Sequence, residues 1–398
     1  MTQSVAQAWL VLRISGNGID LGVVSAASML PVLIGSPPAG ALVERLDKRR
    51  VLLATQTSFL VLATVLGLLT STGVVQVWMV LAVALCFGVV NAVDGPTRQV
   101  YVLDLVGAGR AANAVSMNEV VLNTSRVIGP ALGGALLATV GVAVCFYVNA
   151  ATFLLPIAVL AAGPTRVRVA GGPAVPSPAA AAATARRARV GRERGSFVEG
   201  LRYAWRTPVI RYGVLMAGAS GMLFNMGVAL PLMATRSFHA GGGGYGGMMA
   251  CFGGGALFGA VLAGSGPACP PPRRVRWLAA ATGAAVLGAA AMPDMPAELL
   301  ALAVVGLLSI WFVALANSLV QLRAAPELRS RVMGVWVMAL PGLAVVTGPL
   351  TGWVAGEIGG AAGARDAFGL AGLSLLLAAG AGWRAYGARR EAPGGWAA

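Results

Sequence analysis

The sequence predicts an all-α polytopic membrane protein, and three observations support this fold class. Hydrophobic residues make up 57% of the 398 residues and charged residues only 11%. A soluble domain cannot bury so much apolar surface, because polar residues must cover its exterior. The apolar residues gather in runs of about 20, enough for a helix to cross roughly 30 Å of hydrocarbon. These runs are rich in Leu, Ala, Val and Gly, which favours helices over a barrel.

Eleven apolar segments are long enough to span a membrane. They lie at residues 20–42, 51–71, 75–96, 113–138, 141–162, 208–234, 245–264, 276–292, 297–321, 331–356 and 366–383. A shorter apolar piece, residues 3–14, precedes them and covers only about 18 Å at 1.5 Å per residue. We expect this piece to be the second half of a first helix that is truncated in this sequence. A misplaced start codon is the explanation we favour, and a truncated product is the alternative.

The net charge of +15 comes from arginine clusters that lie between alternate pairs of spans. Cytoplasmic loops of membrane proteins carry such an excess of Lys and Arg. We therefore expect the clustered loops and the C-terminus to be cytoplasmic, in a multi-pass protein of the bacterial inner (plasma) membrane. A nucleic-acid-binding protein would gather its basic residues on one solvated face instead, so we expect no nucleic-acid partner.

The chain divides into two halves that repeat each other. We expect an N-terminal helical half at 1–162, a cytoplasmic linker with an interfacial helix at 163–207, a C-terminal half at 208–384 and a cytoplasmic tail at 385–398. A shift of 224 residues aligns Gly22 with Gly246, and a slightly smaller shift aligns Gly129 with Gly348. Two six-helix halves related by repetition, with a pathway between them, are typical of transporters.

The inventory of reactive residues argues against an enzyme. His239 is the single histidine of the chain, and the four cysteines have neither zinc nor disulfide spacing. The only lysine, Lys48, lacks the preceding glycines of a phosphate-binding loop, and no Gly-x-Ser-x-Gly elbow occurs. We therefore expect no catalytic residues, no metal and no cofactor.

The segment 113–138 carries a polar stripe inside an apolar helix. Glu119, Asn123, Arg126, Pro130 and Gly133 fall within about 60° of one another at 100° per residue. A charge this deep in a membrane is costly unless it faces water or a partner, so the stripe is expected to face a cavity between the halves. The alternative is an Arg126–Glu119 pair that only stabilises packing.

The small residues of the same segment predict close helix packing and a bend. Gly129, Gly133 and Gly134 let a neighbouring helix approach closely, and Pro130 removes one backbone donor. A bend beside a charged stripe, repeated at Gly348-Pro349, suggests a hinge. Tight packing without a hinge is the alternative.

Two motifs resemble signatures of the major facilitator superfamily. The segment SRVIGPALGG resembles the antiporter signature of its exporters, with Gly129, Pro130, Gly133 and Gly134 as the matching residues. The segment GALVERLDKRR resembles the superfamily's loop signature. Its matching residues are Gly40, Arg45, Arg49 and Arg50, while Glu44 replaces an aspartate and Asp47 a glycine. Essentially the whole chain outside the linker and the tail is similar to the enterobactin-exporter-like and drug:proton antiporter branch.

The resemblance implies a major facilitator fold and a cytoplasmic charge latch. Glu44 and Arg45 would take the latch role, together with Asp94 and Arg98 near the end of the fourth helix. A purely topogenic basic cluster is the alternative for this loop. Proton coupling needs a membrane carboxylate whose protonation responds to access, and Asp94 and Glu119 are the candidates.

These observations predict a secondary transporter that exports small molecules in exchange for protons by alternating access. We expect its partners to be a small-molecule substrate such as a drug or siderophore-like metabolite, protons and the lipid bilayer. The substrate would bind near Asn123 and Arg126, and the protein would act as a monomer. An importer or facilitator of the same fold and a truncated, non-transporting remnant are the rival hypotheses.

Overall fold

The computed structural model describes residues 2–43, 46–106, 124–125, 128–129, 132–162, 202–203, 205–223, 226–265, 270–323, 329–358 and 362–387. Within these ranges all regular structure is helical and there are no strands. The prediction of an all-α membrane fold is confirmed. The predicted linker lies outside the described residues, apart from 202–203 and 205–207.

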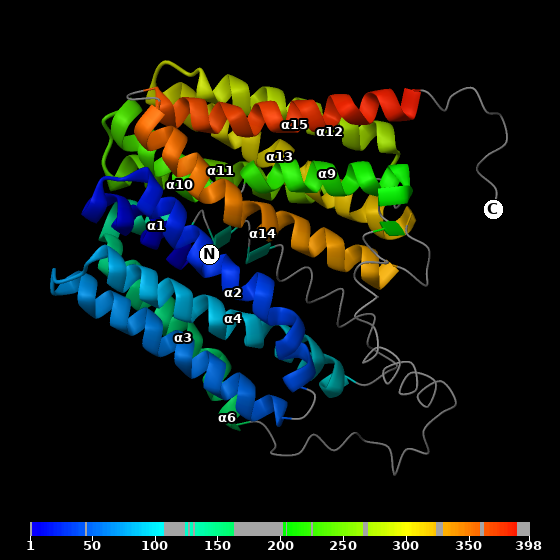
Figure 1. Ribbon diagram of the computed structural model, residues 1–398. Coiled ribbons are helices and arrows are strands. Elements are labelled where there is room, and N and C mark those ends of the chain that lie inside the picture. Colours follow the sequence, from blue (N-terminus) through cyan, green and yellow to red (C-terminus); the bar gives the residue numbers. More distant parts are fainter. Residues whose placement is uncertain are drawn as a thin grey trace, which may run out of the picture.

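Besides the helical residues 132–140, the N-terminal half contributes five helices with defined bounds (Figure 1). They are α1 (Thr2–Ser15), α2 (Gly18–Val43), α3 (Lys48–Ser71), α4 (Val77–Val106) and α6 (Val142–Ala162). Helix α2 packs on α4, and α3 packs on both α4 and α6. Asp47 starts α3 by accepting hydrogen bonds from the backbone nitrogens of Arg49 and Arg50 at 3.0 and 3.4 Å.

Within its described residues, the C-terminal half contains seven α-helices and two π-helical turns. The elements are α9 (Pro208–Leu223), α10 (Met226–Leu232), η2 (Met233–Ser237), α11 (Gly242–Gly264), α12 (Pro272–Ala290), α13 (Met295–Arg323), α14 (Arg329–Trp353), η3 (Val354–Ile358) and α15 (Gly363–Gly387). The sequence predicted plain helical spans at 208–234 and 331–356. Both spans instead finish in a π-helical turn, a feature that often marks functional sites.

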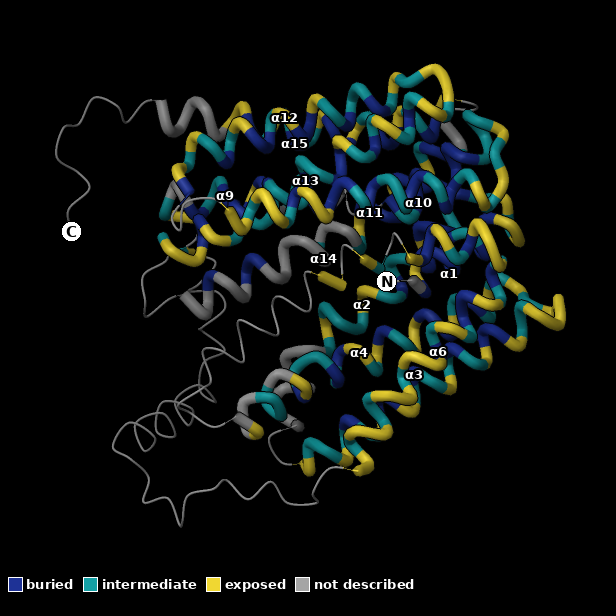
Figure 2. Tube along the Cα trace, turned by 180° about the vertical axis from the view of Figure 1, so that it is seen from behind, coloured by how far each residue is buried: buried dark blue, intermediate teal, exposed yellow. Residues whose placement is uncertain are grey.

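The exterior of the helices is apolar, as contact with lipid requires. Leu155, Phe258 and Leu300 are 71%, 68% and 73% exposed. Figure 2 shows such exposed positions along α3 and the other peripheral helices. Among the described residues, eight helices are long and apolar enough to cross a membrane. The chain is therefore a multi-pass membrane protein.

The two halves touch at one end of the molecule and diverge at the other (Figures 1 and 2). At the end that carries Gly16, Arg236 and Gly356, here called the closed end, α1 and α2 contact α10, α14 and η3. At the opposite end α3, α9 and α12 begin and α6 finishes, and the described helices of the two halves lie apart. We call it the linker end, because the predicted linker joins α6 to α9.

Candidate functional site

Helices α2 and α14 cross at the closed end, and both helices have glycines where they cross. A Cβ atom added to Gly22 would lie 2.5 Å from the Gly348 carbonyl oxygen and 2.6 Å from Pro349 Cα. One turn further toward the end, Gly18 and Gly352 approach each other through their backbones. Real Cβ atoms do not come this close to backbone, so any side chain here would push the halves apart.

A second glycine crossing joins the halves on the other side of the same end. Gly134 lies against the backbone of Gly246 in α11, and its added Cβ would be 3.1 Å from the Ala250 nitrogen. The internal repeat aligns Gly22 with Gly246 and Gly129-Pro130 with Gly348-Pro349. The two crossings are therefore approximate counterparts of each other. This symmetry accounts for the recurrence of glycines in both halves.

The guanidinium group of Arg236 stabilises the closed end by hydrogen bonds to backbone carbonyls. Nη1 donates to the carbonyl oxygens of Ala355 at 3.0 Å and Gly356 at 3.2 Å, and Nη2 donates to that of Gly16 at 3.0 Å. The acceptors belong to η3 and to the turn between α1 and α2, so a single side chain of η2 bridges both halves. The planar fork of a guanidinium suits several fixed acceptors at once.

An aromatic pair fills the interface beside these contacts. The rings of Trp9 in α1 and Tyr245 in α11 stack with centroids 6.0 Å apart and an angle of 18°. Tyr245 is fully buried, and its hydroxyl has no hydrogen-bond partner within the part of the chain that the structure describes. A buried, unsatisfied hydroxyl costs about 1–3 kcal/mol. The closed end thus combines contacts that favour closure with one polar group that opposes it.

Asp94 lies inside the N-terminal half rather than at its surface. It is 3% exposed in α4, and its Oδ1 accepts hydrogen bonds from Thr55 Oγ1 at 2.7 Å and Gln56 Nε2 at 2.8 Å. Both donors belong to α3, so Asp94 ties the two helices together. Among the described residues no ion pair joins it to Arg98, which is exposed.

The loop signature falls partly within the described residues. Gly40 is helical in α2, whereas Glu44 and Arg45 lie outside them, so their latch role stays a prediction. Arg49 donates from Nε to the Leu160 carbonyl at 2.7 Å and from Nη2 to the Ala161 carbonyl at 3.0 Å. These bonds hold the start of α3 against the end of α6 within one half.

Replacing Arg49 with alanine is expected to destabilise the N-terminal half by about 1–3 kcal/mol, because two carbonyls at the end of α6 lose a charged donor. The adjacent Arg50 offers a matched control. Its side chain is 84% exposed and lies 3.6 Å from Asp47, an arrangement that contributes little to stability. Thermal unfolding of the purified protein should show a lower melting temperature for R49A and no change for R50A. Equal melting temperatures for R49A and the wild type would contradict the assignment.

The polar stripe and part of the antiporter motif cannot be placed. Glu119, Asn123, Arg126 and Pro130 lie outside the described residues. Gly129 is helical, and Gly133 and Gly134 are buried. The close contact that Gly134 makes is described above, and the hinge role of the motif stays a prediction.

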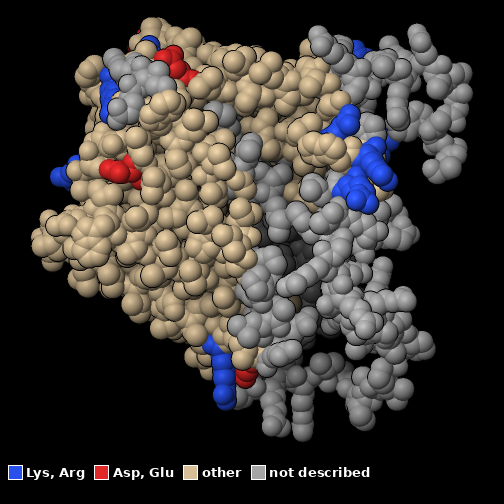
Figure 3. Space-filling view, in the orientation of Figure 1, with Lys and Arg blue, Asp and Glu red and all other residues tan. Residues whose placement is uncertain are grey.

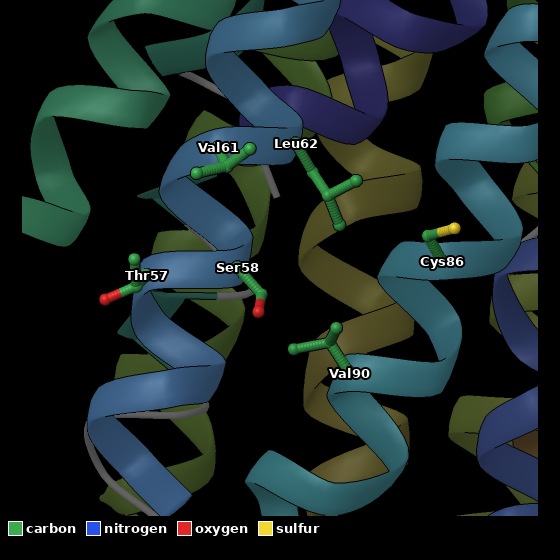
Figure 4. A pocket seen from close by; sticks show the side chains of 6 residues that line it. All are labelled: Thr57, Ser58, Val61, Leu62, Cys86 and Val90. Atoms are coloured by element: carbon green, nitrogen blue, oxygen red, sulfur yellow. The ribbon is translucent and has the colours of Figure 1, made fainter. Parts of the chain in front are cut away.

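A shallow groove of about 320 Å³ opens between α3 and α4 (Figure 4). It is lined by Thr57, Ser58, Val61, Leu62, Cys86 and Val90. Val61 is 52% exposed and Cys86 is exposed as well, so the groove lies on the outer, lipid-facing side of the half. Nothing in its lining faces the interface between the halves, and it is not the candidate pathway.

Arg236 and Glu298, to which the sequence assigns no role, have unexpected surroundings in the structure. Arg236 is the bridge described above. Glu298 is in the first turn of α13, fully buried, with neither carboxyl oxygen hydrogen-bonded within the described part of the chain. No local pattern reveals either role, because their neighbours come from other helices.

Comparison with known proteins settles the family. Residues 1–392 match a major facilitator family described as transmembrane secretion effectors. The multidrug efflux pump Tap of Mycolicibacterium fortuitum is 33% identical over 388 residues, covering 94% of this chain and 88% of its own. The chain belongs to the major facilitator superfamily. Its relatives in that superfamily are transporters rather than enzymes.

More distant superfamily members agree with this assignment. The staphyloferrin A transporter of Staphylococcus aureus is 32% identical over 150 residues, 37% of this chain and 38% of its own. A bacterial homologue of the human lysosomal transporter Spinster shares the fold with a TM-score of 0.71 at 14% identity, covering 98% of this chain and 96% of its own. A D-xylose–proton symporter does so with a TM-score of 0.64 at 15% identity, covering 96% and 95%.

Proposed function

We propose that this superfamily member is a proton-driven exporter of small molecules in the bacterial plasma membrane. The observation that carries the proposal is its likeness to a multidrug efflux pump along 94% of the chain. The one-sided closure of the helical halves supports alternating access, in which the two ends open in turn. We take the protein to work as a monomer.

The positive-inside rule places the linker end in the cytoplasm, because the arginine clusters lie there. The end at which the described helices of the two halves pack together would then face the outside, and the end at which they diverge would face the cytoplasm. Substrate would bind between the halves near Asn123 and Arg126. Export would require the two glycine crossings to separate and the hydrogen bond from Arg236 to the Gly16 carbonyl to break.

Proton coupling would use a carboxyl group inside the membrane. Glu119 shares its helix stripe with Arg126, whose charge would favour the ionised carboxylate in one conformation and not in the other. Asp94 is less suited to this role, because Thr55 and Gln56 already satisfy one of its oxygens. Glu298 is a further buried carboxyl group, remote from the polar stripe in the chain.

Replacing Glu119 with glutamine is therefore expected to uncouple transport from the proton gradient. The E119Q protein should still equilibrate substrate but should not concentrate it, since glutamine cannot exchange a proton. Accumulation of ethidium in pump-deficient cells, with and without a protonophore, measures this coupling, and E298Q is the matched control. Full protonophore-sensitive efflux by E119Q would remove Glu119 from the mechanism, and its loss in E298Q alone would transfer the role to Glu298.

The substrate class follows from the relatives and the polar stripe. The names of the relatives favour amphipathic drugs on one hand and a siderophore on the other. An arginine in the cavity would suit anionic or zwitterionic solutes. Parallel assays with ethidium and staphyloferrin A would separate these classes, and the direction of flux would separate an exporter from an importer.

A further inference from the structure

Charges are segregated between the two ends of the C-terminal half. Its described acidic residues, Asp294, Glu298, Glu357 and Asp366, all lie at the closed end. Asp47 lies at the linker end of the N-terminal half, whereas at the linker end of the C-terminal half the described residues include arginines and no acid. The arginines of interest there form what we call the basic rim: Arg202, Arg206, Arg211, Arg273 and Arg274. On the visible face in Figure 3, Lys and Arg gather at this end of the C-terminal half with no acidic residue of that half beside them.

The less exposed arginines of the rim are held by neutral partners. Arg211 donates to the Tyr212 hydroxyl at 3.2 Å and to the Trp205 carbonyl at 3.5 Å, and its guanidinium carbon is 5.1 Å from the Tyr212 ring centroid. Arg274 lies 5.2 Å from the ring centroid of Trp311. These contacts fix the side chains without neutralising their charge. Arg202, Arg206 and Arg273 are exposed and extend the same positive field.

Two tryptophans mark the depth of the rim in the membrane. Trp205 and Trp277 are each 52% exposed. Trp205 lies just before the span that begins at Ile210, and Trp277 is in the first turns of α12, four residues after Arg273. Half-exposed tryptophans at the ends of membrane spans lie at the level of the lipid headgroups. The arginines beside them are therefore in the plane where phosphate groups of the bilayer lie.

We propose that the basic rim binds the headgroups of anionic phospholipids in the leaflet at the linker end. Guanidinium groups pair with phosphate through parallel hydrogen bonds, and the tryptophan rings cover the adjoining glycerol and upper acyl chain. The position at the ends of membrane spans favours lipid over a soluble acidic protein. Each arginine near an anionic surface is expected to change the preference for anionic lipid about fivefold.

Native mass spectrometry of the detergent-solubilised full chain, titrated with phosphatidylglycerol and phosphatidylcholine, tests the proposal. The wild type should retain phosphatidylglycerol in preference, and the double variant R206Q/R273Q should lose at least tenfold of that preference. The control R13Q removes the charge of an exposed arginine of α1 near the closed end, away from the rim, and should bind like the wild type. Size-exclusion profiles and melting temperatures establish that the variants are folded.

Three results would overturn the proposal. The first is equal binding of the two lipids by the wild type. The second is an unchanged preference in R206Q/R273Q, or the same loss in the R13Q control. The third is displacement of phosphatidylglycerol by inorganic phosphate at equal concentration, which would make the rim a site for free anions. None of these measurements involves transport, so they are independent of the proposed export function.

Discussion

Replacing Arg236 with glutamine is expected to shift the protein away from the conformation that is shut at the closed end. The guanidinium donates three hydrogen bonds to carbonyls of Gly16, Ala355 and Gly356, and only the bond to Gly16 crosses between the halves. A hydrogen bond from a charged donor contributes about 1.5–3 kcal/mol. Its loss should therefore change the ratio of closed to open molecules at this end by about tenfold or more.

Spin labels on Thr72 and Ala291, exposed residues at the closed end of either half, report this change as a longer interlabel distance in R236Q. R236K keeps the charge but lacks the planar fork, and should fall between R236Q and the wild type. R13Q is the matched control, since Arg13 is an exposed arginine of α1 near the same end. An unchanged distance distribution in R236Q would show that Arg236 does not hold the halves together.

Replacing Gly22 with alanine is expected to reduce transport strongly, because the added methyl group disfavours formation of the closed end. Its added Cβ would lie 2.5 Å from the Gly348 oxygen and 2.6 Å from Pro349 Cα, so two helix backbones must separate. Overpacking of this kind costs about 1–3 kcal/mol. Efflux from cells should fall about tenfold or more at equal expression, with a longer distance between the labels on Thr72 and Ala291.

Gly254 provides the matched control for this substitution. It lies within α11, and an added Cβ would meet nothing within 4 Å. Alanine is a better helix former than glycine by about 1 kcal/mol, so G254A should be neutral or slightly stabilising. Efflux by G22A at the wild-type level, or equal losses in G22A and G254A, would contradict the role of the glycine crossing.

The sequence alone is sufficient to predict the membrane fold, because an apolar run long enough to span lipid can adopt few structures. It also singles out the glycines at 22, 129, 133, 246, 348 and 352, since the repeat places them in equivalent positions. Which glycine meets which could not be predicted. The repeat pairs Gly22 with Gly246, yet in the fold each contacts a different helix of the opposite half.

The bridge made by Arg236 could not be predicted at all. Its acceptors are backbone carbonyls, which every residue has, so no side-chain pattern in the sequence indicates them. The π-helical turn η3, which supplies the Ala355 and Gly356 carbonyls, leaves no periodic signal either. Glu298 was missed for a similar reason, because its burial comes from packing at the start of α13 rather than from its place in an apolar run.

Proton antiport is tested most directly by transport into proteoliposomes that carry an imposed pH gradient. Ethidium and staphyloferrin A are added outside in turn, with the vesicle interior acidic or alkaline. We predict uptake only with an acidic interior, because protons leaving the vesicle drive substrate inward whichever way the protein is inserted, and collapse of the gradient should abolish it. Uptake driven by an acidic exterior would make the protein a symporter, and gradient-independent uptake would make it a facilitator. Either result would contradict the proposed function.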